Sequence, residues 1–160
     1  MMTVQEFLSR STQSVLDFLE QELPAIGGAS WWQKMVVEKL TGQQAKVAEQ
    51  KQFSALGDFD LAALLNLLER NWRATTDRTP GLDYRRGLNL IIELKNIRNH
   101  YAHEPTSGTE LGQQLRDVDS IIRLLRMPTA DIRKAASTLE ISRFNRLEFL
   151  PSECRCHFGN

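Results

Sequence analysis

The chain has 160 residues, which suits one domain with a substantial hydrophobic core and leaves little room for two. Its 20 Lys and Arg residues balance its 20 Asp and Glu residues, so no overall positive field indicates a nucleic-acid-binding surface. No apolar stretch approaches the ~20 residues of a membrane span, and the N-terminus lacks the basic region and apolar core of a signal peptide. We therefore expect a cytoplasmic protein with no membrane partner.

Apolar residues recur at three- and four-residue spacing along most of the chain, which predicts helices and neither strands nor an internal repeat. Three segments have the spacing of a capping box, in which side chains satisfy the free backbone amides of a first helical turn. Each is expected to begin a helix. The three segments are Thr3 to Glu6, Ser30 to Gln33 and Ser107 to Glu110.

The first predicted helix follows Thr3 and ends before Pro24, because proline lacks the amide hydrogen that a helix interior needs. A second helix is expected from Ser30 to Leu40, with Trp31, Met35 and Val36 along it. The polar segment 43–53 is either a short helix or a loop. The first helix is expected to bury Val4, Phe7, Leu8, Val15, Phe18 and Leu19.

A third helix is expected after Asp58 or Asp60, either of which can cap its first turn. The polar segment from Thr75 to Gly81 is predicted to turn the chain. Asp83 can then start a fourth helix, which ends at Pro105 because proline restricts the residue before it. The third helix is expected to bury Leu61, Leu64, Leu65, Leu68 and Trp72.

Two further helices complete the prediction, which is a single all-α helical bundle of about five to six helices at residues 1–140, with a tail at 141–160. In the tail, Cys154, Cys156 and His157 lack a fourth ligand and a recognised structural spacing, so no metal or other cofactor is expected there. The penultimate helix stops at Pro128. Its apolar stripe is Leu111, Leu115, Val118, Ile122 and Leu125, and the last helix carries Ile132, Ala135, Ala136 and Leu139.

The segment Arg98-Asn99-His100-Tyr101-Ala102-His103 combines side chains that can bind a phosphate and transfer a proton. Arginine is always charged and suits phosphate oxygens, whereas histidine changes its charge near neutral pH and can move a proton. Residues 69–103 contain 7 basic and 4 acidic side chains, against 5 and 8 in residues 1–68, so positive charge gathers around this segment. An RNA substrate brings its own nucleophile, the 2′-hydroxyl. These residues could therefore cleave a phosphodiester without a metal ion.

On a helical wheel the fourth helix has two faces. Arg98 lies at the edge of the apolar face, and at five residues' separation Arg98 and His103 point ~140° apart. A two-fold pairing of this helix would bring both residue types to one groove. The apolar face holds Leu90, Leu94, Ile97 and Tyr101. The opposite face, which suits an interface, holds Ile92, Asn96, Asn99 and His103.

Structural explanations compete with the chemical one at each of these positions. Arg98 could form a salt bridge with Glu69 or Glu93. His103 could simply stabilise the negative end of its helix, and His100 lies on another face as a surface or supporting residue. Asn96 and Asn99 could only cap or solvate the helix. Tryptophan at helical apolar spacing is usually core, which is expected for Trp72, whereas one of Trp31 and Trp32 could stack on a base.

The order Arg98, Asn99, three residues, His103 resembles the R-N-x-x-x-H motif of the HEPN superfamily. The similarity extends over roughly residues 30–127. Within it, a helix ending in Asn71-Trp72 precedes the helix with Arg-Asn and Ala-His, as in one subgroup of that superfamily. Members of the subgroup are attached to PIN-domain endoribonucleases of RNA quality control and to bacterial ATPases and helicases of phage-defence type.

The resemblance implies a small helical domain that dimerises and acts on RNA as a metal-independent endoribonuclease. Arg98 would hold the phosphate, His103 would transfer a proton, and Asn99 would orient either of them. Glu93 is the candidate acidic partner, and Asn96, His100 and Tyr101 are supporting residues. The alternative is a non-catalytic module that binds RNA or a protein, as an appendage of an ATPase or helicase system. A nucleotidyltransferase partner, a phage-defence role and a toxin–antitoxin role are further expectations.

Overall fold

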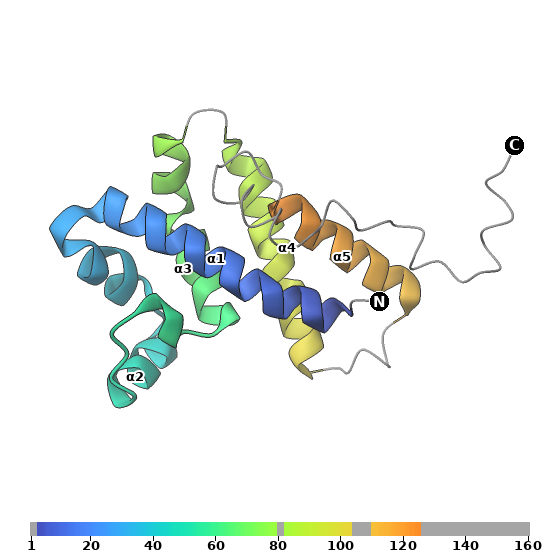
Figure 1. Ribbon diagram of the computed structural model, residues 1–160, viewed down its shortest axis with the longest axis horizontal. Coiled ribbons are helices and arrows are strands. Elements are labelled where there is room, and N and C mark those ends of the chain that lie inside the picture. Colours follow the sequence, from blue (N-terminus) through green and yellow to red (C-terminus); the bar gives the residue numbers. More distant parts are fainter. Residues whose placement is uncertain (1–2, 80–81, 104–109, 126–160) are drawn as a thin grey trace, which may run out of the picture.

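The computed structural model describes residues 3–79, 82–103 and 110–125, and within these ranges every regular element is helical (Figure 1). The prediction of an all-α fold is therefore confirmed. Short 3-10 or π-helical turns separate the longer helices; they are η1 (Gly28–Ser30), η2 (Trp32–Val36), η3 (Val37–Lys39) and η4 (Leu56–Asp58). The α-helices are α1 (Val4–Gly27), α2 (Gly42–Gln50), α3 (Leu61–Arg78), α4 (Tyr84–His103) and α5 (Leu111–Leu125).

Helix α1 begins as predicted but extends past its proline. The Thr3 hydroxyl accepts a hydrogen bond from the Glu6 amide at 3.2 Å, and the Glu6 carboxylate accepts one from the Thr3 amide at 2.6 Å. The expected end before Pro24 is wrong, because the helix continues to Gly27. Leu19 and Leu23 are fully buried beside Pro24, and this packing offsets the missing amide hydrogen. Gly28 ends the helix with φ of 62°, a conformation that favours glycine.

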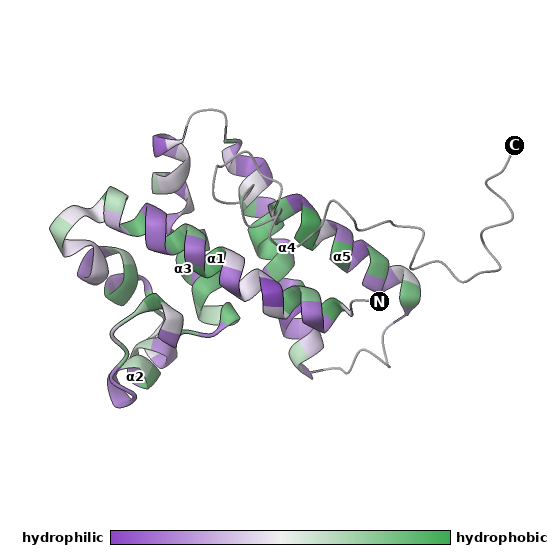
Figure 2. Cartoon of the chain, in the orientation of Figure 1, coloured by the Kyte–Doolittle hydropathy of each residue, from purple (hydrophilic) through white to green (hydrophobic). Residues whose placement is uncertain are grey.

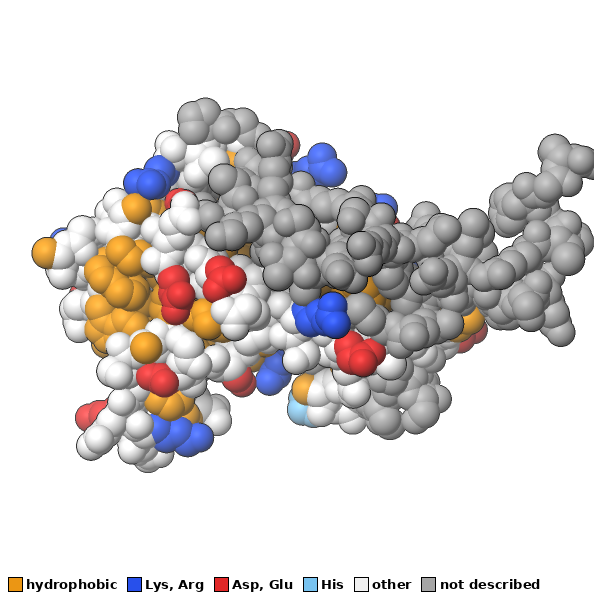
Figure 3. Space-filling view, in the orientation of Figure 1, with side chains coloured by type: hydrophobic (Ala, Val, Ile, Leu, Met, Phe, Trp, Pro, Cys, Tyr) orange, Lys and Arg blue, Asp and Glu red, His pale blue; other side chains and the backbone are white. Residues whose placement is uncertain are grey.

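The predicted second helix is instead the irregular run η1–η3, and no side chain caps it, so the expected capping box from Ser30 to Gln33 is wrong. The capping box lies later, where the Thr41 hydroxyl accepts a hydrogen bond from the Gln44 amide at 3.3 Å. It starts α2, so the segment left open between helix and loop is mainly a short helix. Figure 3 shows hydrophobic side chains gathered over the segment that follows α1.

The core forms where α1 and α4 each pack against both α3 and α5. In Figure 1, α1 crosses in front of α3, and α5 lies beside α4. Figure 2 shows hydrophilic and hydrophobic residues alternating along α1 and α5, as expected for helices with one buried face. The predicted apolar residues of α1 and α3 are all buried.

Helix α5 buries only part of the apolar stripe that the sequence suggested: Val118 is buried, as expected, but other members of the stripe are not. Leu111 is 41% exposed, and Ile122 is only partly buried. The buried apolar residues of the helix are Val118, Ile121 and Leu124. The predicted helix start at Ser107, the helix at 132–139 and the tail at 141–160 lie outside the described residues.

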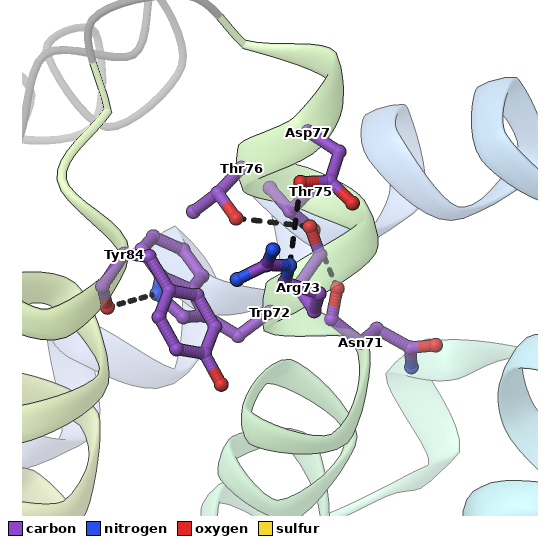
Figure 4. Close-up of polar contacts among 7 residues, drawn as sticks. All are labelled: Asn71, Trp72, Arg73, Thr75, Thr76, Asp77 and Tyr84. Carbon is purple, nitrogen blue, oxygen red and sulfur yellow. Dashed lines mark hydrogen bonds and ion pairs between the residues drawn. The ribbon is translucent and has the colours of Figure 1, made fainter.

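Helices α3 and α4 approach each other closely at Trp72. Its indole is fully buried, and its N–H donates to the Tyr84 carbonyl at 2.9 Å (Figure 4). A Cβ atom at Gly87 would lie 2.1 Å from Trp72 Cζ2, so only glycine fits there. Helix α3 also continues to Arg78, through the turn predicted at Thr75. Thr75 is buried, and its hydroxyl donates to the Asn71 carbonyl at 3.1 Å.

We expect Gly87→Ala to destabilise the domain by about 1–3 kcal/mol, because the new methyl group must displace the Trp72 ring or separate two helices. Thermal and urea unfolding measure this change. Gly112→Ala is the matched control, since the nearest atom that its Cβ would meet is an Arg116 side-chain nitrogen at 3.6 Å. That control should be neutral or slightly stabilising. Equal effects of the two substitutions would contradict the packing described.

Candidate functional site

Helix α4 carries the motif as one continuous helix. Its first turn is capped by Asp83, whose carboxylate accepts a hydrogen bond from the Arg86 amide at 2.9 Å, as predicted. The expected apolar face is confirmed, since its four residues are buried, and Ile91 is buried with them. The motif therefore occupies the last two turns of a helix whose rotation is fixed by the core.

Arg98 projects from the edge of the buried face, and its side chain is 31% exposed. Its Nη2 atom lies 3.4 Å from Asp60 Oδ2, and its Nη1 atom donates to Asn99 Oδ1 at 3.3 Å. Both contacts are long, and the Asp60 side chain is 65% exposed. An exposed ion pair of this kind contributes only ~0–1 kcal/mol. The guanidinium can therefore exchange Asp60 for another anion at little cost.

The two glutamates expected as partners of Arg98 bind elsewhere. Glu69 forms an ion pair with Lys95, between α3 and α4. Glu93 accepts a hydrogen bond from the Ser120 hydroxyl of α5. Each glutamate is therefore bonded to another side chain, and the carboxylate that contacts Arg98 is that of Asp60.

Asp60 also caps the N-terminus of α3. Its Oδ1 atom accepts a hydrogen bond from the Ala63 amide at 2.9 Å, which makes it the N-cap that the sequence suggested. Its other oxygen faces Arg98. The sequence identified the cap but not the link to Arg98, which lies 38 residues away along the chain.

The face opposite the core is open, as expected for an interface. Ile92 is 40% exposed, which is high for an isoleucine, and Asn96, Asn99 and His103 are also exposed. Asn99 contacts Arg98 and so orients the cation. His103 is exposed, and its imidazole forms no hydrogen bond or ion pair with the other residues that the structure describes.

Tyr101 fixes the end of α4 against α5. Its hydroxyl donates to Asp117 Oδ2 at 2.9 Å, and Gln113 Nε2 donates to Asp117 Oδ1 at 2.6 Å. Asp117 is buried, so these bonds satisfy a carboxylate that would otherwise be costly to bury. The His100 ring meets the Tyr101 ring edge-on, with 4.9 Å between centroids. Tyr101 and His100 therefore support the helix that presents His103.

A groove of about 520 Å³ opens beside Arg98, between α2, η4 and the first turn of α3. It was not predicted from the sequence; its lining includes the helix cap Asp60 and residues of the polar segment 43–53. Trp72 is core, as expected, and Trp31 and Trp32 are both partly buried against each other, with ring centroids 5.5 Å apart. Neither tryptophan lines this groove.

No group of three or more His, Cys, Asp or Glu side chains that could hold a metal ion occurs among residues 3–79, 82–103 and 110–125. Cys154, Cys156 and His157 lie outside these ranges. In the same part of the chain, no helix is both long and apolar enough to cross a membrane.

The fold and the motif agree with a comparison of the sequence with known families. A family model described as Swt1-like HEPN matches residues 7–127, which include most of α1 and all of α2 to α5. The chain therefore belongs to this HEPN family, and the match begins earlier than the resemblance over residues 30–127 suggested. No curated protein and no solved structure matches the chain.

We expect Asp60→Asn to change the free energy of unfolding by less than ~1 kcal/mol, because asparagine caps a helix as well as aspartate does and the lost ion pair is exposed. Asp60→Ala should lose about 1 kcal/mol more, since it also removes the cap. Urea unfolding of both variants measures the difference. If Asp60→Asn is as damaging as Asp60→Ala, the ion pair with Arg98 contributes more stability than its exposure allows.

Proposed function

We propose that this domain is a metal-independent endoribonuclease whose active site forms between two copies of α4. The observation that carries the proposal is the state of Arg98, a partly exposed cation held by two long contacts and followed by an exposed His103. Membership of a HEPN family supports a role in RNA binding or cleavage.

The proposed reaction uses groups that the chain and its substrate already supply. His103 takes the proton of a ribose 2′-hydroxyl, and the resulting oxygen attacks the adjacent phosphorus. The bond from phosphorus to the 5′-oxygen breaks, and the protonated His103 gives its proton to that oxygen. Arg98 holds the phosphate and its developing negative charge, while Asn99 keeps the guanidinium in place. The products are a 2′,3′-cyclic phosphate and a 5′-hydroxyl.

The geometry of one helix argues for two copies. Arg98 and His103 project ~140° apart from α4, so one helix alone aims them poorly at a single phosphate. A two-fold axis across the open face would place Arg98 of one copy opposite His103 of the other. Ile92 on this face supplies an apolar contact for such a pairing. Association is therefore part of the proposed mechanism.

The competing proposal is a non-catalytic HEPN module in which the same face binds RNA or a protein partner. The open face with Ile92 supports either role, because both need an exposed contact surface. Under either proposal, a neighbouring gene for an ATPase, a helicase or a nucleotidyltransferase would favour a phage-defence or toxin–antitoxin setting.

We expect the isolated protein to be a two-fold dimer that Ile92→Asp converts to a monomer, because the new carboxylate would be buried in the pairing face. Light scattering of the purified chain at micromolar concentration measures both states. Leu111→Asp is the control, since Leu111 is 41% exposed but lies on α5. A wild-type monomer that RNA does not convert to a dimer would contradict the shared groove.

We expect replacement of His103 and replacement of Arg98 to have different effects on RNA cleavage and RNA binding. His103→Ala should lower the cleavage rate by ~10²- to 10⁴-fold and leave most RNA affinity, because it removes proton transfer but no phosphate charge. Arg98→Ala should weaken both cleavage and binding, and it should reduce the salt dependence of binding. Digestion of end-labelled RNA in EDTA, scored for cyclic-phosphate ends, measures cleavage. A thermal melt of each variant confirms that it is folded.

Two results would overturn the enzyme proposal. If the wild type binds RNA but cleaves it no faster than His103→Ala, the binding module is correct. If the wild type neither binds nor cleaves RNA, a protein-binding role is correct. Loss of wild-type cleavage in EDTA that magnesium or manganese restores would contradict the metal-independent mechanism.

A further inference from the structure

The groove beside Arg98 has the size of a small-molecule site. Its volume of about 520 Å³ falls within the ~300–1,000 Å³ that is typical of ligand pockets. Arg98 lines one end of it, and the same guanidinium contacts Asn99 of the motif. A ligand in the groove would therefore touch the cation that the proposed reaction uses.

One wall of the groove is apolar and held in place. Val47 of α2 lines it and is 37% exposed, which is high for a valine. Phe53 lines it too, and its ring packs edge-on against the buried Phe59, with 5.0 Å between centroids. Phe59 in turn lies 6.3 Å from the Trp32 ring. A fixed apolar wall of this kind suits a flat aromatic ligand.

Gln44 supplies an oriented hydrogen-bond donor to the same groove. Its Oε1 atom accepts from the Thr41 amide and from Asn66 Nδ2, both at 3.1 Å. Asn66 is buried, so these two bonds fix the plane of the Gln44 amide. Among the described residues, none accepts a hydrogen bond from Gln44 Nε2. A ligand acceptor, such as a ring carbonyl or a ring nitrogen, would satisfy it.

The charges of the groove favour a neutral ligand group inside it. Lys51 and Arg98 are balanced by Asp58 and Asp60. Backbone amides of the preceding segment donate to the Asp58 carboxylate and hold its pKa below the usual value, so this carboxylate stays charged. A phosphate inside the groove would meet the charged Asp58 carboxylate, whereas a phosphate at its Arg98 end would meet the guanidinium in exchange for the long contact with Asp60. A neutral ring inside with a phosphate at that end fits both conditions.

We propose that this groove binds the nucleobase of the nucleotide whose phosphate Arg98 contacts. The apolar wall at Val47 and Phe53 packs against the ring, and the Gln44 amide donates to its polar edge. The proposal rests on the proposed function, because it takes Arg98 to be a phosphate-binding residue. It adds a base-binding subsite on α2, far in the sequence from the motif.

Nuclear magnetic resonance of the full chain tests the groove directly. The probes are the four nucleoside 3′-monophosphates, with ribose 5-phosphate as the control that lacks a base. We expect at least one nucleotide to shift the Gln44 side-chain amide and the Val47 methyl signals, and ribose 5-phosphate to leave them in place. If no nucleotide shifts them, or if ribose 5-phosphate shifts them equally, the base-binding proposal is wrong.

A substitution that fills the groove separates this proposal from the nuclease proposal. Val47→Trp should raise the KM for cleavage of a short RNA by roughly 5- to 100-fold, which is the value of one lost base contact, and leave kcat nearly unchanged. Val37→Trp is the matched control, because Val37 is 38% exposed and lies outside the groove. Wild-type cleavage with an unchanged KM in Val47→Trp would refute the groove and leave the nuclease intact. Nucleotide binding at Gln44 without any cleavage would refute the nuclease and leave the groove.

Discussion

The contact between the Trp72 indole and the bare backbone of Gly87 sets how α3 and α4 cross, and the site depends on that crossing. The indole N–H, on the same edge of the ring, also donates to the Tyr84 carbonyl, so two contacts with α4 fix this edge. Asp60 lies at the start of α3 and Arg98 near the end of α4. Their 3.4 Å approach requires both helices to keep this relative position. A wider separation of the two helices at Gly87 would therefore move Arg98 relative to Asp60.

Asn71 and Trp72 are adjacent in the sequence, and each joins α3 to another segment. Asn71 is buried, and its amide nitrogen donates to the Met35 carbonyl at 2.9 Å and to the Leu67 carbonyl at 2.8 Å. It thereby attaches the irregular η2 turn to α3, while Trp72 attaches α4 to the other side. Two adjacent residues thus connect three segments. The connection holds the aromatic residues near η2 against Phe59, at one end of the groove.

The sequence predicted what local rules determine. Helix caps at Thr3, Asp60 and Asp83 and the buried face of α4 follow from nearest neighbours and helical period, and the structure confirms them. It did not predict the continuation of α1 through Pro24, because tertiary packing of Leu23 decides that. Nor could it predict the ion pair from Asp60 to Arg98, since side chains 38 residues apart meet only once the helices have packed. The groove on α2 could not be predicted for the same reason, because its lining residues come from separate segments that meet only once the chain has folded.

The central claim is that Arg98 of one copy and His103 of its partner complete a single active site. Mixing Arg98→Ala with His103→Ala tests it most directly, after unfolding and refolding the two variants together. If the site is shared, the mixture should recover about a quarter of the wild-type rate, because half of randomly paired dimers are mixed and each retains one intact site of two. A mixture no more active than either variant alone would contradict the shared site.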